Sequence, residues 1–558
     1  MISSPSIPVP ELSLYDVLKK TSKENGQKIA YEFLGYEYTY NQFVSQVDDL
    51  SLRLKKLGVK MGDKVVICLP NCPQAFISFY AISRLGAVSV MVHPLSSSNE
   101  IEFYVEDSGS KVCITMDKFA NKFPEIGKTC MEKLIVTRIT DTFSPLKRFF
   151  AKLFVKEAKP MKVNDPKATM WMDFMKMNIS DIDKSMPQVS PDEPASILYT
   201  GGTTGRNKGA VHSSRSFNVT SMGMIELSGI LGEGDTMLTQ MPMFHGFGLC
   251  TCVHLPVCIG LRCVIMPNFT LDSLCKTIVD YKVNFIAGVP SMYEKMVDNE
   301  YLKNADLSFL RGIFCGGDSM STESKARFDN FIAEHGCTRK IRIGFGCTEC
   351  LTATAITPKF EERPGSVGVP IPGMMYKIVQ IDTMDEAPDG EYGEMCISGP
   401  ALMMEYLNNK EETENTLRVH EDGRTWLHTG DLGCIKDGFI YFTNRIKRII
   451  ITSGYNVYPS QIEEILGQHP SVESSCVIGV PDRLRGMKVK AVIVLKQGVE
   501  PSEETKASIS SFVKKNVSSY AKPREYEFVD SLPKTKLAKV DYRALEKREI
   551  ERLESTSE

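Results

Sequence analysis

Short apolar runs rich in Val and Ile alternate with longer helical patterns between residues 60 and 350. Residues 64–69 and 87–92 are predicted to be buried strands, and residues 72–85 between them are typical of a helix. The same strand pattern returns at residues 284–289, 311–315 and 340–343. This alternation predicts layered α/β sheets, with ligands bound outside the carboxyl ends of strands.

The pattern changes after residue 360, where Gly and Pro punctuate short strands such as residues 390–397. The last hundred or so residues predict a helix at 459–468, strands at 476–479 and 489–495, and a helix at 503–517. The predicted fold class is therefore α/β: a large N-terminal domain of layered α/β sheets plus a β subdomain, followed by a small α+β C-terminal domain.

Composition and charge are those of an ordinary soluble chain. The 558 residues are enough for two to four domains, and 42% of them are hydrophobic and 24% charged. A net charge of -3 does not favour nucleic acid, so we expect no nucleic-acid partner. The first residues lack a basic and then apolar signal pattern, and the apolar run 75–92 is interrupted by Arg84 and Gly86. A cytoplasmic location is predicted.

The sixteen cysteines are scattered without regular spacing, which is typical of reduced thiols used as small apolar residues. Cys347 and Cys350 form a CxxC pair. A second metal-like pair is not evident and no thioredoxin-like pattern surrounds it, so we predict neither a zinc nor a redox role.

Residues 145–160 predict a basic amphipathic helix. One face carries the apolar residues Leu146, Phe149, Phe150, Leu153 and Phe154, and the basic residues around them are Lys147, Arg148, Lys152, Lys156 and Lys159. Such a helix can make peripheral contact with an anionic membrane, or can pack on its own domain. The sequence leaves both interpretations open.

Residues 199–209 combine glycines, hydroxyl residues, Arg206 and Lys208 directly after the apolar segment 195–198. Glycines let a backbone approach an anion closely, while hydroxyls and N–H groups donate hydrogen bonds to it. The run predicts a phosphate-binding loop, although it does not end in the Gly-Lys-Ser/Thr tripeptide of a Walker motif. Without support from other segments, an ordinary solvated turn is the alternative interpretation.

Six further segments accompany the loop in order: 241–248, 344–349, 427–431, 444–448, 453–459 and 533–539. Together they resemble the adenylate-forming superfamily, which includes acyl- and aryl-CoA synthetases, firefly luciferase and nonribosomal peptide adenylation domains. The resemblance runs from about residue 12 to 550 and is closest to acyl-CoA synthetases. It implies that a carboxylate attacks the α-phosphorus of ATP, and that coenzyme A as co-substrate then displaces AMP. Carboxyl groups ionise near pH 4, so the first step needs no general base, only Mg²⁺, positive charge and positioning.

The resemblance also assigns residues. It implies a phosphate cradle made of Thr200, Gly201, Gly202, Thr203, Thr204, Gly205 and Lys208. It implies that Gly344, Phe345, Gly346 and Cys347 bind the nucleotide, with Phe345 stacking on adenine where a tyrosine is usual. Thr348 would touch the α-phosphate and Glu349 would ligate Mg²⁺. Asp431 would bind the ribose with Arg445 nearby, His245 would contact the substrate carboxylate, and Gly317 and Asp318 would lie at adenine or the acyl channel.

In the C-terminal part, Lys539 resembles the lysine that stabilises charge during adenylation. Lys447 matches a hinge about which a mobile C-terminal domain rotates, and Gly454 would line the pantetheine path. The predicted domains are therefore residues 1–445, which bind AMP and the acyl group, and 446–558. The sequence departs from the pattern at Gly201, Asn207, Arg448 and Ala538, which affects hinge geometry more than the reaction class.

The segment after Phe244 lacks the aspartate of amino-acid-activating relatives, so the substrate is predicted to be a small carboxylic acid without an amine. A medium- or long-chain fatty acid is favoured because Met, Cys and Phe populate the pocket segments. An aryl acid of the 4-coumarate type is close behind, and an acyl-AMP ligase that does not use CoA is a third alternative. A monomer or a homodimer is expected.

Overall fold

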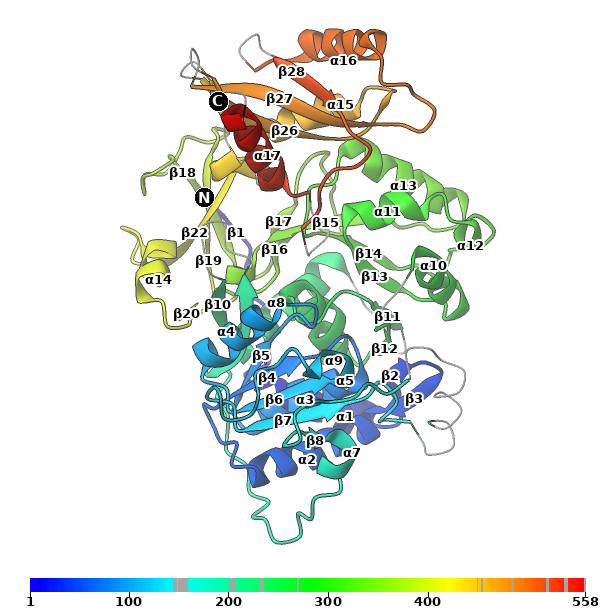
Figure 1. Cartoon of the computed structure of the whole chain (residues 1–558), viewed down its shortest axis with the longest axis vertical. Helices are drawn as coiled ribbons and strands as arrows, with labels where there is room; N and C mark the ends of the chain where they lie inside the picture. Colours follow the sequence, from blue (N-terminus) through cyan, green and yellow to red (C-terminus); the bar gives the residue numbers. More distant parts are fainter. Residues whose placement is uncertain are drawn as a thin grey trace.

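The computed structural model describes residues 1–143, 148, 159–200, 207–229, 235–267, 270–448, 450–452, 455–482, 486–517, 521–535 and 540–555. Within them the strands form four sheets, and Figure 1 shows the two largest sheets in the lower body and the C-terminal sheet above it. The predicted α/β class is confirmed.

The first large sheet has eight strands and contains the strands predicted at 64–69 and 87–92. Its order is β20 (Glu405–Tyr406), β10 (Lys208–Ser213), β9 (Pro194–Thr200), β5 (Val88–Met91), β4 (Lys64–Cys68), β6 (Val112–Met116), β7 (Lys133–Thr137) and β8 (Thr169–Met170). The helices that follow these strands are α3 (Pro73–Arg84), α4 (Ser98–Ser108), α5 (Asp117–Ala120), α7 (Trp171–Phe174) and α8 (Ser214–Ser228). The central strands are parallel, whereas β10 and β20 at one edge are antiparallel.

The second large sheet has nine strands and contains the three strands predicted between 284 and 343. Its order is β17 (Val369–Pro370), β16 (Ala353–Ile356), β15 (Ile341–Gly346), β14 (Gly312–Cys315), β13 (Phe285–Gly288), β11 (Thr236–Thr239), β12 (Arg262–Ile265), β2 (Ile29–Phe33) and β3 (Tyr36–Thr39). Its helices are α1 (Leu14–Asn25), α2 (Tyr40–Lys56), the π-helical segment Phe247–His254, α9 (Leu255–Ile259), α10 (Leu271–Asp280), α11 (Pro290–Met296), α12 (Glu300–Lys303) and α13 (Thr322–Glu334). β15 runs three residues beyond its predicted end, so it carries Gly344, Phe345 and Gly346 as strand residues.

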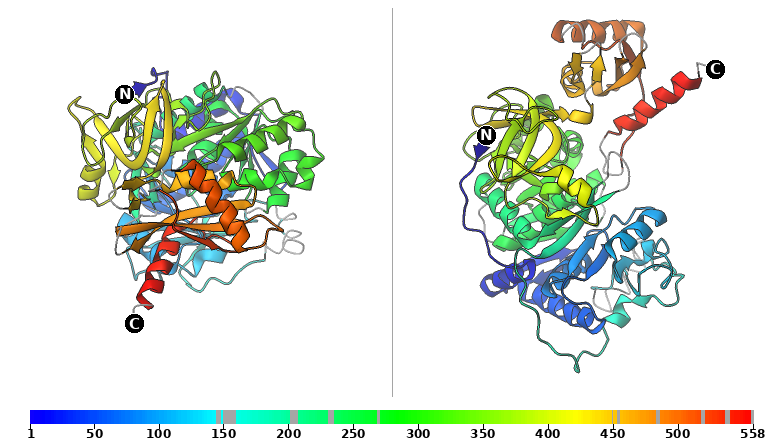
Figure 2. Two further views of the ribbon diagram at one scale, coloured as in Figure 1. Left: turned by 90° about the horizontal axis from the view of Figure 1, so that it is seen from above. Right: turned by 90° about the vertical axis from the view of Figure 1, so that its left-hand side faces the viewer.

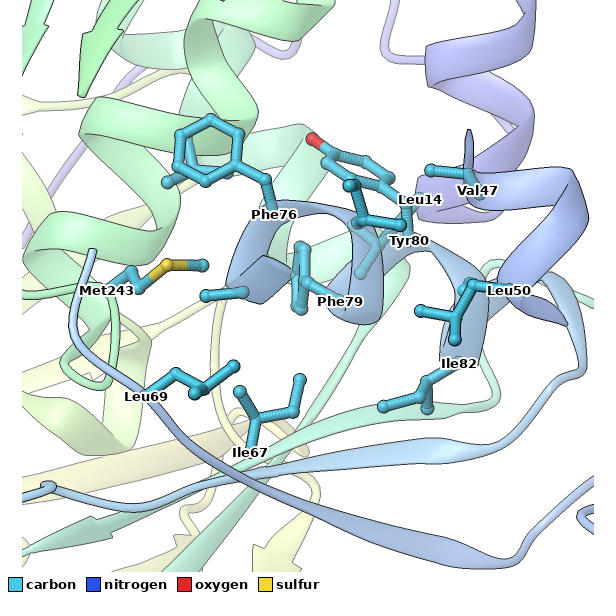
Figure 3. Packing of buried hydrophobic residues seen from close by; sticks show 14 of the residues in the cluster. Leu14, Val47, Leu50, Ile67, Leu69, Phe76, Phe79, Tyr80, Ile82 and Met243 are labelled. Atoms are coloured by element: carbon cyan, nitrogen blue, oxygen red, sulfur yellow. The ribbon is translucent and has the colours of Figure 1, made fainter. Parts of the chain in front are cut away.

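The core explains the continuous apolar runs. In β4, Val65 and Ile67 join the cluster of α3, while Val66 and Cys68 on the other face join the cluster of α4. Alternate side chains of a strand point to opposite faces, so a strand buried on both faces has no polar positions. Figure 3 shows Phe76 and Phe79 of α3 in the cluster that also holds Ile67.

The β subdomain is a six-stranded sheet that carries Asp431 and Arg445 of the predicted site. Its path is β1 (Ile2–Ser3), β18 (Met375–Val379), β19 (Gly393–Ser398), β22 (Thr425–Lys436) and β21 (Leu417–Val419), with β23 (Phe439–Arg445) paired to β22 and α14 (Lys410–Thr416) beside it. The predicted β subdomain is confirmed.

The C-terminal sheet has five strands: β25 (Tyr455–Val457), β24 (Ile450–Thr452), β27 (Gly486–Leu495), β26 (Val472–Asp482) and β28 (Glu525–Phe528). The helices α15 (Pro459–Gly467), α16 (Glu503–Asn516) and α17 (Tyr542–Ser555) accompany it, and Figure 2 shows it as a distinct lobe. The predicted α+β region is confirmed. The domain boundary after residue 445 and the mobility of this lobe stay predictions.

The predicted basic helix 145–160 lies almost entirely outside the described residues. Among the helices that the structure does describe, none combines the length and apolar character needed to cross a lipid bilayer.

Candidate functional site

The predicted phosphate loop connects two antiparallel strands of the first sheet. β9 ends at Thr200 and β10 begins at Lys208, and these two residues lie opposite each other in the register. Gly201, Gly202, Thr203, Thr204 and Gly205 lie outside the described residues, so their roles stay predictions. The hairpin nevertheless fixes both ends of the loop.

Lys208 is held by residues about two hundred positions later in the chain. Its Nζ lies 2.7 Å from Oε2 of Glu412 in α14 and 4.5 Å from the ring centroid of Tyr406. Tyr406 is placed there because β20 pairs with β10, with Tyr406 opposite Ala210. The lysine of the predicted phosphate loop is thus paired with a carboxylate and stacked on an aromatic face.

Glu349 meets the same tyrosine. The Tyr406 hydroxyl donates a hydrogen bond of 2.6 Å to Oε1 of Glu349, and the N–H of Met403 donates one of 2.7 Å to the Glu349 carbonyl. Burial first, and then the Glu349 charge, raise the pKa of Tyr406, so this hydroxyl stays protonated and remains a donor. Tyr406 therefore links Lys208 to Glu349.

The backbone of Thr348 is held by a hydrogen bond from a buried histidine. The Nε2–H of His212 in β10 donates a hydrogen bond of 2.8 Å to the Thr348 carbonyl. Burial lowers the pKa of His212 to about 4, so the ring is neutral at neutral pH. We call Thr200, Lys208, Thr348 and Glu349, with His212, Tyr406 and Glu412, the phosphate side of the site.

Asp431 and Arg445 form a cross-strand pair on β22 and β23. They lie opposite each other in the register, and Arg445 Nε is 3.1 Å from Asp431 Oδ1. The Asp431 residue is 3% exposed. The Asp431 charge is the main cause that raises the pKa of Arg445, and Cys347 and Glu349 add to it. The strand register and the ion pair therefore fix Asp431 and Arg445 to each other.

Glu394 holds the segment before Asp431 in place. Its carboxylate accepts the Gly430 N–H at 2.9 Å through Oε1 and pairs with His428 Nδ1 at 2.8 Å through Oε2. Gly430 has a φ of +69°, a conformation that favours glycine. We call Asp431, Arg445, Glu394, His428 and Gly430 the ribose side of the site.

Phe345 lies between the two sides. Its ring is half-buried and its centroid is 5.5 Å from that of Phe442 in β23, with 33° between the planes. Gly344 and Gly346 flank it on β15, and Cys347 precedes the short 3-10 helix Thr348–Cys350. The predicted nucleotide segment is therefore one continuous strand end.

The predicted acyl-site residues come from two loops that follow β14 and β11, two strands of the nine-stranded sheet with β13 between them. Gly317 and Asp318 follow β14, where Asp318 is exposed and accepts the N–H of Ser319 at 2.9 Å. His245 is half-buried, and its Nδ1 accepts the N–H of Phe247 at 3.3 Å.

Of the predicted C-terminal site residues, Gly454 and Lys539 lie outside the described residues. The backbone of Lys447 belongs to the 3-10 turn Ile446–Arg448. Arg448, one of the departures from the family pattern, pairs with Glu463 of α15 at 2.6 Å. Arg448 therefore forms an ion pair with a helix of the C-terminal lobe.

Two arrangements of acidic groups bear on metal binding. Glu349 offers the single carboxylate that suits Mg²⁺, which is commonly held by one or two carboxylates together with phosphate oxygens. In the part of the chain that the structure covers, Glu394, Cys396 and His428 form a buried group with metal-ligand chemistry. Glu394 and His428 are already paired with each other, so this group carries no metal assignment.

Sequence reasoning missed four supporting residues: His212, Glu394, Tyr406 and Glu412. Tyr406 and Glu412 reach Lys208 only through the pairing of β10 with β20, for which no local pattern exists. Glu394 could have been found, since a glutamate on a predicted strand of the β subdomain points to a partner on the neighbouring strand.

The comparisons with known proteins agree with this geometry. The chain matches the AMP-binding enzyme family over residues 18–407 and the AMP-binding enzyme C-terminal domain over residues 461–539. It is 30% identical over 555 residues to a long-chain-fatty-acid–CoA ligase of Bacillus subtilis (strain 168), covering 98% of this chain and 96% of that protein. It is 29% identical over 537 residues to 4-coumarate–CoA ligase 2 of Oryza sativa subsp. japonica, covering 92% of this chain and 87% of that protein.

Solved structures show the same fold. The anthranilate CoA ligase AuaEII in complex with anthranoyl-AMP superposes with a TM-score of 0.82 at 24% identity, covering 97% of this chain and 98% of that one. A benzoate CoA ligase from Burkholderia xenovorans LB400 gives a TM-score of 0.79 at 23% identity, covering 96% and 100% of the two chains.

Proposed function

This chain belongs to the AMP-binding enzyme family, and from that premise we propose that it is an ATP-dependent acyl-CoA synthetase. It would convert a medium- or long-chain fatty acid, ATP and CoA to acyl-CoA, AMP and pyrophosphate through an acyl-adenylate. One observation carries the proposal: Lys208 and Glu349, which come from distant segments, meet at Tyr406.

In the first step the fatty carboxylate, already ionised, attacks the α-phosphorus and pyrophosphate leaves. Lys208 offsets charge on the departing phosphates, and the Thr348 hydroxyl donates to an α-phosphate oxygen. Mg²⁺ held by Glu349 would neutralise phosphate charge. Asp431 accepts hydrogen bonds from the ribose hydroxyls and fixes the nucleotide for in-line attack.

The second step uses the C-terminal lobe. We propose that Lys539 stabilises the charge of adenylation, and that the lobe then turns about Lys447 so that Gly454 lines the pantetheine path. The coenzyme A sulfur attacks the acyl carbonyl and AMP leaves. Lys539→Ala should abolish adenylation and spare thioester formation from pre-made acyl-AMP.

A fatty acid is favoured as substrate because the segment after Phe244 has no acid for an ammonium group. A long-chain-fatty-acid–CoA ligase is also among the most similar curated relatives. An aryl acid is the second candidate, because the rice 4-coumarate–CoA ligase is nearly as similar at 29% identity.

Pyrophosphate release against a panel of acids, each with and without CoA, tests the function. The panel contains octanoate, palmitate, 4-coumarate, benzoate and leucine. We expect the fastest release with a fatty acid and formation of its CoA thioester. Fastest release with 4-coumarate would select the aryl candidate, and release without thioester would select an acyl-AMP ligase. No acid-dependent release would refute the function.

Peripheral membrane contact through residues 145–160 is a separate proposal that rests on the sequence pattern. Flotation with anionic liposomes should carry the wild type and leave the Phe149→Glu/Phe154→Glu variant behind. Equal flotation of both proteins would end this proposal.

A further inference from the structure

Two cysteines enclose the catalytic pair Thr348 and Glu349. Cys347 precedes Thr348, Cys350 follows Glu349, and their sulfur atoms are 3.5 Å apart. The sequence pattern gave no reason to expect a redox role for these thiols. Their separation in the structure does.

The two thiols have different surroundings. Cys350 is fully buried, whereas Cys347 is partly exposed. Three groups point at the Cys350 sulfur: the N–H of Cys347 at 3.2 Å, the Thr354 hydroxyl at 3.6 Å and the Cys347 thiol. The Cys350 thiol itself donates to the carbonyls of Cys347 at 3.4 Å and Thr352 at 3.3 Å, so its sulfur is held beside that of Cys347 by contacts on several sides.

Two other buried cysteines have a different arrangement. The Cys68 sulfur faces the His93 carbonyl at 4.0 Å, and the Cys250 sulfur lies 3.5 Å from the Ser221 hydroxyl. The pair at the site instead combines a partly exposed sulfur at Cys347 with a buried sulfur at Cys350, 3.5 Å away.

The backbone after Cys350 is held in a rare conformation and is closely packed. Leu351 has a φ of 68° and a ψ of −57°, and the Thr352 N–H donates to the Cys350 carbonyl at 2.8 Å, which is the rare, strained γ-turn. Gly246 packs on this turn so closely that a Cβ there would lie 1.7 Å from the Leu351 oxygen. Because the backbone on the Cys350 side is held, we expect closure of the two sulfurs to shift the segment Cys347–Glu349.

We propose that Cys347 and Cys350 form a reversible disulfide that switches off adenylation, with hydrogen peroxide as the oxidant. The Cys347 thiol reduces the peroxide, giving a sulfenic acid and one water. The Cys350 sulfur attacks the Cys347 sulfur, the S–O bond breaks, and the hydroxyl leaves with the Cys350 proton as a second water. Two thiols are oxidised by two electrons and one peroxide is reduced to two waters.

The disulfide acts through the two residues that it encloses. An S–S bond of about 2.05 Å requires the sulfurs to approach by about 1.5 Å. This movement breaks the contacts of Glu349 with Tyr406 and of Thr348 with His212. A displacement of about 1 Å in a catalytic group can cost about 100-fold in rate. The effect on rate rests on the proposed function, whereas formation of the bond does not.

Peptide mapping and pyrophosphate release test the proposal together. Full-length protein is reduced, freed of reductant and exposed to hydrogen peroxide. Trypsin yields the peptide 343–359, whose only cysteines are Cys347 and Cys350. We expect this peptide to lose two hydrogen atoms and resist alkylation. Acid-dependent pyrophosphate release should fall at least tenfold and return after dithiothreitol.

Variants separate the disulfide from general oxidation. Cys350→Ser keeps Cys347, which peroxide can still oxidise to a sulfenic acid, but its peptide 343–359 should not lose two hydrogen atoms because the attacking sulfur is absent. Cys130→Ser removes an exposed cysteine remote in sequence from the pair and should respond as the wild type does.

A peptide that stays fully alkylated after peroxide would overturn the proposal, as would a disulfide that leaves pyrophosphate release unchanged. If the Cys350→Ser protein does not fold, peptide mapping of the wild type still decides. If the reduced wild type releases no pyrophosphate with any acid, the proposed function fails, and the peptide mass still reports on the bond.

Discussion

The ribose side and the phosphate side of the site hold their charged groups differently. On the ribose side, Asp431 and Arg445 sit opposite each other on adjacent strands, and Glu394 fixes the backbone before Asp431. On the phosphate side, Lys208 and Glu349 come from segments far apart in the chain and meet at Tyr406. The ribose side is built from neighbouring strands. The phosphate side is built from segments that are far apart in the sequence and come into contact in the fold.

Under the proposed function the difference bears on what each side does when ATP binds. Asp431 is already held by its strand and by Arg445, so we expect the ribose side to be preorganised. Lys208 is paired with Glu412, a carboxylate that we expect the phosphates to displace. Variants on the two sides should therefore differ in the size and even the sign of their effects.

The largest effect is expected from Asp431→Ala. It removes a buried acceptor and leaves Arg445 without its partner, and hydrogen bonds to charged groups contribute about 1.5–3 kcal/mol each. Acid-dependent pyrophosphate release should lose about 100-fold or more in kcat/KM for ATP. Glu391→Ala, an exposed acid of the same subdomain, is the control. A loss below fivefold for Asp431→Ala would show that the ribose side is not preorganised.

Acid should weaken the support that His212 gives to the phosphate side. The pKa of His212 is about 4 in the folded chain and about 6.5 unfolded, so the unfolded state binds more protons between these values. His212 therefore contributes a loss of stability as pH drops below about 6.5, of about 1.4 kcal/mol at pH 5.5. Urea unfolding at pH 7.5 and 5.5 measures the total loss, to which His254 and His420 add because burial lowers their pKa values too. His212→Gln, which keeps an N–H donor, should reduce the total by the contribution of His212.

Glu394 of the ribose side should resist the same change. Burial acts to raise the pKa of Glu394, but the bonds from His428 and Gly430 outweigh it and the pKa is lowered. The stability that this carboxylate contributes is present above about pH 4.3 and is lost only as pH falls through its lower folded pKa. If wild type and His212→Gln lose equal stability between pH 7.5 and 5.5, this contrast between His212 and Glu394 is wrong.

Opposite signs are expected within the phosphate side. Lys208→Ala should raise the KM for ATP about tenfold, because a charge contact to phosphate is lost. Glu412→Ala should lower it about two- to fivefold, since the pair is part-exposed and such pairs contribute about 0.2–1 kcal/mol. Glu411→Ala on the same helix is the matched control. An increase in KM for Glu412→Ala would mean that Glu412 positions Lys208 and does not compete with phosphate.

The smallest effect is expected at Phe345, between the two sides. Phe345→Tyr keeps the stacking face and should change the KM for ATP less than about twofold, whereas Phe345→Ala should raise it about fivefold, near 1 kcal/mol of stacking. Steady-state kinetics with varied ATP measures both. Equal values for the Ala and Tyr variants would remove adenine stacking from the role of Phe345.

The sequence predicted those parts of the molecule that local patterns determine. β4 and α3 follow from apolar runs buried on both faces, and Asp431 and Arg445 were found within short motifs. Glu412 and Tyr406 were not found, because their contact with Lys208 depends on β10 pairing with a two-residue strand about two hundred positions later. The turn at Leu351 was also missed, since its strained backbone belongs to a residue that usually avoids positive φ.

The first strand of the chain pairs with one that follows it by more than 370 residues: Ile2 lies opposite Tyr376 and Ser3 opposite Met375. During synthesis at about 5–20 residues per second, β1 has to wait roughly 20 s or longer before β18 leaves the ribosome. The edge of the β subdomain is therefore completed late, after every strand of the nine-stranded sheet and every strand of the eight-stranded sheet except β20 has been translated. Until then β1 is an unpaired strand edge, and the order of assembly is set by the rate of translation as well as by the contacts of the finished fold.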